Sequence, residues 1–115
     1  MLGYHVTQDW TDGEDLKAFA NLHPWNDETT RILIQRALEM WQENWSVEKA
    51  RHYYDHDARH IHIHENLTEA RSFMEKHGGC ILEIMLDGLN IQRNEKSLFV
   101  PDIIPAERVR RLMCY

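Results

Sequence analysis

The chain has 115 residues, 43% of them hydrophobic, which suits a single domain over residues 1–115 and argues against a disordered chain. Its net charge of −6 argues against general nucleic-acid binding, because phosphate contacts need clustered Lys and Arg. No apolar run approaches the roughly 20 residues of a membrane span, and the first residues lack a basic-then-apolar leader. We therefore expect a cytoplasmic protein that acts on a small ligand or a protein partner.

Residues 3–7 are expected to form the first strand. Side chains alternate between the two faces of a strand, so His5 and Thr7 share one face while Tyr4 and Val6 share the other. Two polar side chains facing one way in an otherwise apolar strand mark a candidate site.

Helical spacing dominates the next segment. A short helix is expected within residues 16–22, and Asn26 or Asp27 caps a longer one. Ser46 caps a further helix that runs to about residue 54. The apolar stripe of the longer helix, which we expect in the core, contains Ile34, Ala37, Leu38, Trp41 and Trp45.

Histidines alternate with isoleucines in residues 60–64, directly after Arg59, which predicts a strand. His60, His62 and His64 then share one face, and the two isoleucines face the other way. A buried imidazole needs hydrogen-bond partners for its nitrogens. The sequence therefore predicts that something polar lies in front of this face, such as water, an anion, a metal or a nucleotide.

The rest of the chain predicts one helix and three strands. The helix covers residues 66–77 and ends at two glycines, and the strands cover residues 81–86, 97–100 and 108–114. This order indicates an α+β fold, with helices concentrated in the first half and a sheet whose topology can be mixed.

Two cysteines, Cys80 and Cys114, lie far apart in the sequence. Cys80 begins a predicted core strand, so we expect a small buried thiol rather than a disulfide or a nucleophile.

A metal site is one interpretation of the histidine face. Two of the three rings could reach one ion, with further ligands from Asp55, His56, Asp57 or Glu65. Alternate residues lie about 7 Å apart along a strand, so three successive rings rarely bind the same ion. Zinc is therefore the weaker alternative, and no residue is assigned as a metal ligand.

A ligand cleft is the other interpretation. If the first strand and the histidine strand line one cleft, the site contains His5, Thr7, Arg59, His60 and His62. Imidazoles can donate to ribose hydroxyls, and an arginine can make two hydrogen bonds to a phosphate. No pair of carboxylates, nucleophile arrangement or glycine-rich phosphate loop accompanies these residues.

The order of these segments resembles the ADP-ribosyltransferase superfamily. Tyr4-His5-Val6-Thr7 resembles its first-strand Tyr-His-x-Thr motif, and the segment from Arg59 to His62 is similar to a motif of its RNA 2′-phosphotransferase branch. The resemblance covers roughly residues 2–8 and 58–113. It also rests on Leu67-Thr68-Glu69-Ala70, Lys76-His77-Gly78, the stretch from Cys80 to Leu89 and the stretch from Phe99 to Val109.

This resemblance implies a split, mixed β-sheet with an NAD-binding cleft between its halves and, in this chain, a helical segment inserted after the first strand. By the resemblance, His5 contacts the ribose of the nicotinamide half and Thr7 supports it. The other wall falls on Arg59, His60 and His62, of which His62 would fix the geometry of the cleft. We expect a His5→Ala variant to fold and to lose nucleotide binding.

The chain departs from the family pattern at several positions that bear on its activity. Val6 replaces the glycine of the phosphotransferase branch, and the arginine-rich N-terminal motifs of that branch are missing, so 2′-phosphotransferase activity is not expected. Glu95 is the nearest candidate for the family's late glutamate, which stabilises an oxocarbenium-like transition state. If Ser97 occupies that position instead, the chain would bind nucleotide without transferring ADP-ribose.

The sequence thus predicts an NAD- or nucleotide-binding ADP-ribosyltransferase-like protein, with a macromolecular acceptor if it is active. Two alternatives stay open: an inactive protein-binding module that uses the helical segment over residues 26–54, and a histidine-based metal-binding protein.

Overall fold

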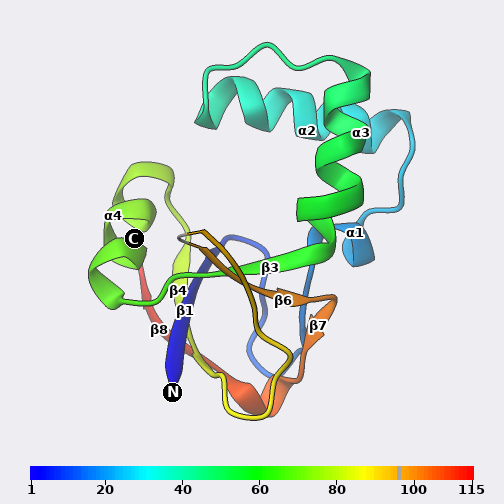
Figure 1. Cartoon of the computed structure of the whole chain (residues 1–115). Coiled ribbons are helices and arrows are strands. Elements are labelled where there is room, and N and C mark those ends of the chain that lie inside the picture. The colour runs from blue at the N-terminus through cyan, green and yellow to red at the C-terminus, as the bar shows by residue number, and fades with distance from the viewer. Residues whose placement is uncertain (96) are drawn as a thin grey trace.

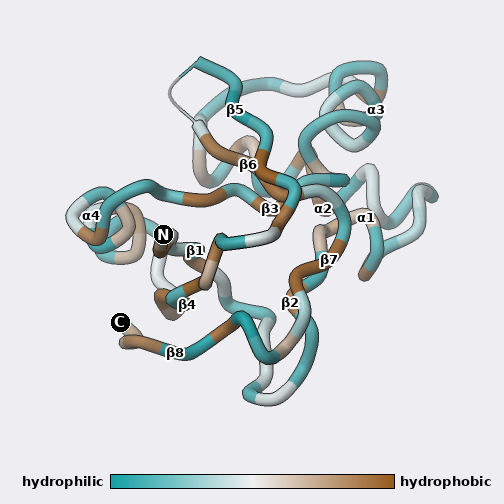
Figure 2. Tube along the Cα trace, turned by 60° about the horizontal axis from the view of Figure 1, so that its bottom comes forward, coloured by the Kyte–Doolittle hydropathy of each residue, from teal (hydrophilic) through white to brown (hydrophobic). Residues whose placement is uncertain are grey.

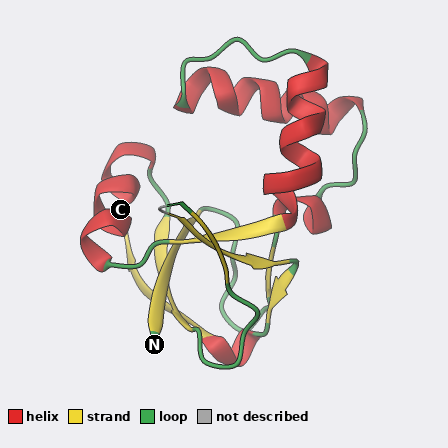
Figure 3. Ribbon diagram, in the orientation of Figure 1, coloured by secondary structure: helices red, strands yellow, loops and turns green. Residues whose placement is uncertain are grey.

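The computed structural model describes residues 1–95 and 97–115, in which antiparallel strands combine with four α-helices in an α+β fold (Figure 1). Figure 3 separates the helices from the strands. In chain order the elements are β1 (Leu2–Thr7), β2 (Leu16–Lys17), α1 (Phe19–Leu22), α2 (Asp27–Met40), α3 (Val47–His56), β3 (His60–Ile63), α4 (Leu67–His77), β4 (Cys80–Met85), β5 (Gln92–Asn94), β6 (Ser97–Pro101), β7 (Ile103–Ile104) and β8 (Val109–Cys114).

Two three-stranded sheets meet at a single bridge. One sheet has the order β1-β4-β8 and the other β3-β6-β5, while β2 and β7 form a separate pair. Tyr4 and His64 exchange two backbone hydrogen bonds, of 3.0 and 2.7 Å, so β1 and β3 lie side by side where the sheets join. All strand pairs among the described residues are antiparallel, whereas the resemblance implies a mixed sheet.

The main hydrophobic core lies between these two sheets. Ile61 and Ile63 of β3 are buried, as their alternation with histidines predicts, and they pack with Leu82 and Ile84 of β4. Figure 2 shows hydrophobic stretches on the neighbouring strands β3 and β6. The opposite face of the β1-β4-β8 sheet packs on α4 through Met74 and other apolar side chains. Apolar residues facing inward from both sheets therefore leave the histidines of β3 on the outer face.

The helices α2 and α3 form a second hydrophobic cluster, centred on Leu33 and Tyr54, and Figure 1 draws them together on the side away from β8. Their predicted caps are confirmed: Asn26 accepts a hydrogen bond from Thr29 N, and Ser46 accepts one from Lys49 N. The prediction of Leu38 and Trp41 in the core is wrong: Leu38 is 56% exposed, and Trp41, which follows the end of α2 at Met40, is 42% exposed.

Short elements account for the other differences from prediction. Residues 16–22, expected to be one helix, form β2 and then the four-residue α1. β2 pairs with β7, more than 80 residues later in the chain, through Leu16 and Ile104. A two-residue strand has no periodicity to detect, and only the distant partner makes it a strand.

Cys80 and Cys114 form a disulfide, so the prediction of a buried thiol is wrong. They are register partners at the first residue of β4 and the last of β8. Cys80 is partly buried and Cys114 is exposed, because this end of the sheet lies outside the core. In the described part of the chain, none of the helices has the length and apolar character needed to cross a membrane.

Candidate functional site

His5 occupies the seam between the two sheets. Its ring is partly buried, and its Nδ1 lies 2.7 Å from the backbone oxygen of His62. A carbonyl oxygen can only accept a hydrogen bond, so Nδ1 carries the proton and Nε2 is the acceptor nitrogen of the neutral ring. Burial lowers the pKa of His5 from 6.5 to about 4, although its bond to the His62 carbonyl acts in the opposite direction.

The outer face of β3 carries a row of aromatic rings. His60, His62 and His64 share this face, as the sequence predicts, and each is partly buried. The rings of His62 and His64 have centroids 4.6 Å apart. The row extends from β6 across β3 to α4, and we call it the ring row: Phe99, His62, His64, Phe73 and His77.

The histidines of the ring row on β3 are neutral at pH 7. Burial lowers the pKa of His64 to about 4, and the neighbouring His62 and His5 add to this shift because like charges would repel. Burial also lowers the pKa of His62, against the raising effect of Glu69. A neutral imidazole has one donor and one acceptor nitrogen. This face is therefore suited to hydroxyl and amide groups rather than to anions.

A cleft of about 510 Å³ opens beside His64, and we call it the α4 cleft. Four ring-bearing side chains line it: Trp41 at the end of α2, His64, and Phe73 and His77 of α4. Hydroxyl and ammonium groups join them on α4, from Thr68, Ser72 and Lys76. The volume of this cleft lies in the range of small-molecule sites, and the cleft is open to solvent along much of its length.

None of the α4 residues of this cleft is among the site residues predicted from the sequence. Thr68, Ser72 and Lys76 follow one another at intervals of four residues, which places them on one face of a helix. That spacing can be detected in the sequence. The position of Trp41 beside the cleft cannot, because it depends on how α2 packs against the rest of the fold.

The other predicted site residues have separate surroundings. The Thr7 hydroxyl accepts a hydrogen bond from Asp9 N at 3.1 Å. The exposed Arg59 places its guanidinium 5.6 Å from the ring centroid of Tyr54, and His60 Nδ1 donates to the backbone oxygen of His56. The structure thus brings His5 beside His62, while Arg59 turns to the helical cluster.

Glu95 is exposed in the turn between β5 and β6 and has a left-handed backbone, with φ of 52°. Ser97 begins β6 and pairs in register with Asn94. Glu65, just beyond β3, forms an ion pair with Arg93 on β5, so this hairpin is tied to the end of the histidine strand. The turn therefore lies beside the β3 end that carries His64.

Within residues 1–95 and 97–115, no group of three or more His, Cys, Asp or Glu side chains is arranged to hold a metal ion. Comparisons of the chain with protein-family models, with curated proteins and with solved structures return no match. The protein is thus described by its own features. It is an α+β protein in which a face of neutral histidines lies beside a cleft lined by aromatic and polar side chains.

Proposed function

We propose that this chain binds NAD or a related nucleotide as an ADP-ribosyltransferase-like protein, and that the split sheet of that superfamily is its architecture. One observation carries the proposal: the first-strand motif with His5 lies beside the histidine strand at the junction of two sheets. These segments are 57 residues apart at their point of contact. Their meeting at a sheet junction is the arrangement that the resemblance implies.

The neutral histidines support a ligand rich in hydroxyl groups. His62 and His64 each offer a donor and an acceptor nitrogen, which matches the hydroxyl pairs of a ribose. Protonated rings would instead favour anions. In this proposal His5 holds the nicotinamide ribose, and His62 fixes the geometry between the two strands.

The α4 cleft offers the complementary groups for the rest of a nucleotide. Trp41 and Phe73 present aromatic rings on which a base can stack, and Thr68 and Ser72 present hydroxyls. The Lys76 ammonium supplies positive charge for a phosphate, although the Glu69 carboxylate lines the same cleft. A volume of about 510 Å³ accommodates a nucleotide-sized ligand.

We propose that the protein transfers ADP-ribose to a protein or other macromolecular acceptor, and that Glu95 acts in this step. Its carboxylate is exposed at the β5–β6 turn and would stabilise positive charge that develops on the ribose. Thr7, Arg59 and His60 keep their proposed cofactor-binding roles from the resemblance. For Arg59 this requires the guanidinium to leave the ring of Tyr54.

The test is a thermal-shift titration of metal-free protein with NAD, with zinc in parallel. We expect a saturable rise in melting temperature with NAD, because a ligand that binds only the folded state stabilises it by mass action. His5→Gln should lose most of this rise while keeping a hydrogen-bond donor for the His62 carbonyl. His56→Gln, an exposed histidine on α3, is the matched control and should keep it.

Further variants separate the parts of the proposal. His64→Ala should weaken NAD binding at least several-fold if the α4 cleft holds the nucleotide. Glu95→Gln should bind NAD like the wild type, because its carboxylate acts on transfer rather than on binding. A wild-type protein whose melting temperature does not respond to NAD would sink the proposal, and a response to zinc alone would favour the metal alternative.

A protein-binding module is the second candidate function. Three apolar side chains near the connection between α2 and α3 are well exposed: Leu38 at 56%, Trp41 at 42% and Val47 at 61%. Exposed apolar groups of this kind are typical of interaction sites when they lie together. This candidate gains if neither NAD nor zinc changes the melting temperature.

A further inference from the structure

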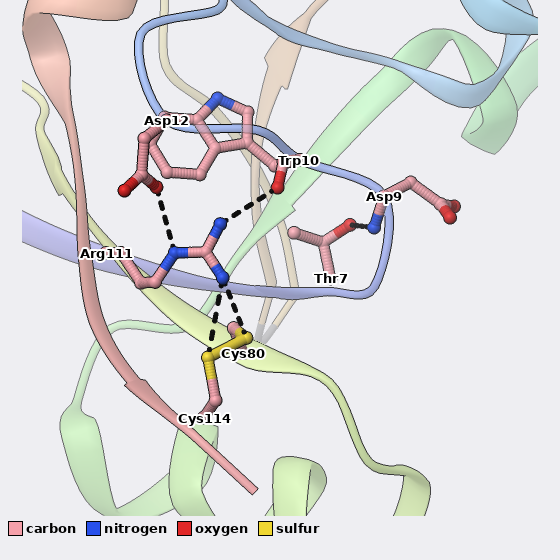
Figure 4. The surroundings of a disulfide bond; sticks show 7 residues. All are labelled: Thr7, Asp9, Trp10, Asp12, Cys80, Arg111 and Cys114. Carbon is pink, nitrogen blue, oxygen red and sulfur yellow. Dashed lines mark hydrogen bonds and ion pairs between the residues drawn. A yellow bond between two sulfur atoms is a disulfide. The ribbon is translucent and has the colours of Figure 1, made fainter.

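The disulfide links the central strand β4 to the edge strand β8 at one end of the β1-β4-β8 sheet (Figure 4). Cys80 is a partly buried residue and Cys114 is an exposed one, so Cys114 is the cysteine nearer to solvent. The chain contains two cysteines in all, and oxidation or reduction therefore interconverts two defined states without reshuffling to a third thiol.

Arg111 brings a positive charge to both sulfur atoms. Its Nη1 lies 3.3 Å from Cys80 Sγ and 3.5 Å from Cys114 Sγ. Figure 4 draws the guanidinium above the disulfide, between the sulfurs and the loop that contains Trp10 and Asp12.

Three further contacts hold this guanidinium in place. Its Nε donates to Asp12 Oδ1 at 2.9 Å and its Nη2 donates to Trp10 O at 3.1 Å. The guanidinium carbon lies 5.5 Å from the Trp10 ring centroid, and Trp10 is a buried residue. Arg111 therefore does not depend on the disulfide for its position, and its charge stays near the sulfurs when they are reduced.

A fixed guanidinium favours the reduced state in two ways. It stabilises a thiolate, which is the charged product of disulfide cleavage, and it does little for the uncharged disulfide. It also speeds cleavage, because a better stabilised thiolate leaves faster. Disulfides inside cells are commonly redox-active ones, so this assignment also fits the predicted cytoplasmic location.

We propose that Cys80–Cys114 is a thiol–disulfide exchange site for low-molecular-weight thiols, with Arg111 stabilising the thiolate that leaves. An incoming thiolate attacks Sγ of Cys114, the more exposed of the two residues, forms a mixed disulfide there and expels Cys80 as a thiolate beside Arg111. A second thiol then attacks the external sulfur and releases Cys114. Two thiols are oxidised to one small-molecule disulfide, the protein gains two electrons, and the two protons end on the cysteines or in solvent.

This site is separate from the proposed nucleotide site. The test equilibrates oxidised protein with glutathione buffers of known ratio, traps free thiols by alkylation and counts them by mass. Arg111→Gln should make the disulfide harder to reduce, by roughly threefold to tenfold in the exchange constant, or about 15 to 30 mV. Its reduction by glutathione should also be several-fold slower.

Arg110→Gln is the matched control. Arg110 is the neighbouring residue on β8, and it pairs with Glu83 rather than with the sulfurs, so its variant should match the wild type. Asp12→Asn provides an independent variant on an exposed side chain. It keeps an acceptor for Arg111 and removes the opposing charge, so the disulfide should become easier to reduce.

Three results would overturn the proposal. The first is an unchanged exchange constant in both Arg111→Gln and Asp12→Asn. The second is an equal shift in Arg110→Gln, which would indicate a general effect of net charge. The third is a wild-type protein that keeps two free thiols in an oxidising buffer.

Discussion

His5 has a structural role at the residue scale, whatever it binds. Its Nδ1–H satisfies the backbone oxygen of His62 at the place where β1 and β3 separate. A buried carbonyl left without a donor costs roughly 1–3 kcal/mol. His5→Ala would therefore weaken the fold as well as any site, contrary to the expectation from sequence, whereas His5→Gln keeps a donor.

The lowered pKa of His5 predicts a loss of stability in mild acid. Because the folded-state pKa is about 4 against 6.5 for the ordinary group, the unfolded chain binds more protons between these values. The free energy of unfolding should be highest above pH 7 and should fall as the pH drops from about 6.5 towards 4. At pH 5 the titration of His5 should have lowered the free energy of unfolding by on the order of 2 kcal/mol.

Urea unfolding at pH 7 and pH 5 measures this loss. We expect His5→Gln to lose less stability than the wild type between these two pH values, while His56→Gln behaves like the wild type. The pKa of His64 is also lowered, but this side chain is more exposed, so its contribution to the loss of stability should be smaller. Equal losses in the wild type and His5→Gln would contradict the assignment.

At the element scale, α4 is the helix whose limits are clearest in the sequence. Asn66 Oδ1 accepts a hydrogen bond from Glu69 N at 2.8 Å, and Gly78 ends the helix with φ of 78°. Both are local signals, which is why the helix is confirmed almost residue for residue.

Gly79 adds a constraint that sequence reasoning did not include. Its φ is 95°, and a Cβ atom there would lie 2.7 Å from the backbone oxygen of Thr7. Gly13 also has a left-handed φ, of 90°, but a Cβ there meets no atom within 4 Å. An alanine at Gly13 would meet only the cost of the left-handed backbone, whereas an alanine at Gly79 would also clash with β1.

We predict that Gly13→Ala costs about 1–2 kcal/mol, the usual price of a left-handed residue with a side chain. Gly79→Ala should cost clearly more, because α4 and β4 must move away from β1 as well. Chemical denaturation of both variants measures the difference. Similar losses of stability would show that the junction between α4 and β1 can relax.

At the scale of the whole molecule, the buried hydrophobic residues form three clusters: the core between the sheets, the contact between α4 and the β1-β4-β8 sheet, and the smaller cluster of α2 and α3. The core between the sheets includes Leu82 and Leu98 and draws on most of the strands. The cluster of α2 and α3 has Leu33 and Tyr54 as its large buried side chains, with two alanines. A smaller buried surface implies that the helical pair opens at lower free energy than the sheets.

Native-state hydrogen exchange should detect this division. Leu33→Ala is expected to reduce the protection of amides in α2 and α3 by roughly 2–4 kcal/mol and to leave the slowest amides of β4 less affected. Leu98→Ala should do the reverse. If both variants lower the protection of all elements equally, the molecule opens as one unit and the division has no energetic meaning.

The sequence predicted the elements that local periodicity encodes. These include the histidine strand with its buried isoleucines, the capped helices α2, α3 and α4, and the core strand β4. It also predicted that His5 and His62 would meet if their strands lined one site, and the seam brings them together. Its resemblance to the ADP-ribosyltransferases, its NAD site and its cytoplasmic location stay predictions.

The tertiary structure decided the features that depend on contacts between distant segments. It paired β2 with β7, exposed Trp41 at the edge of the α4 cleft and set Cys80 opposite Cys114. The physical reason is range. Strand alternation and helix caps act over a few neighbouring residues, whereas a cleft, a disulfide or an arginine held against sulfur needs partners that only the folded chain brings together.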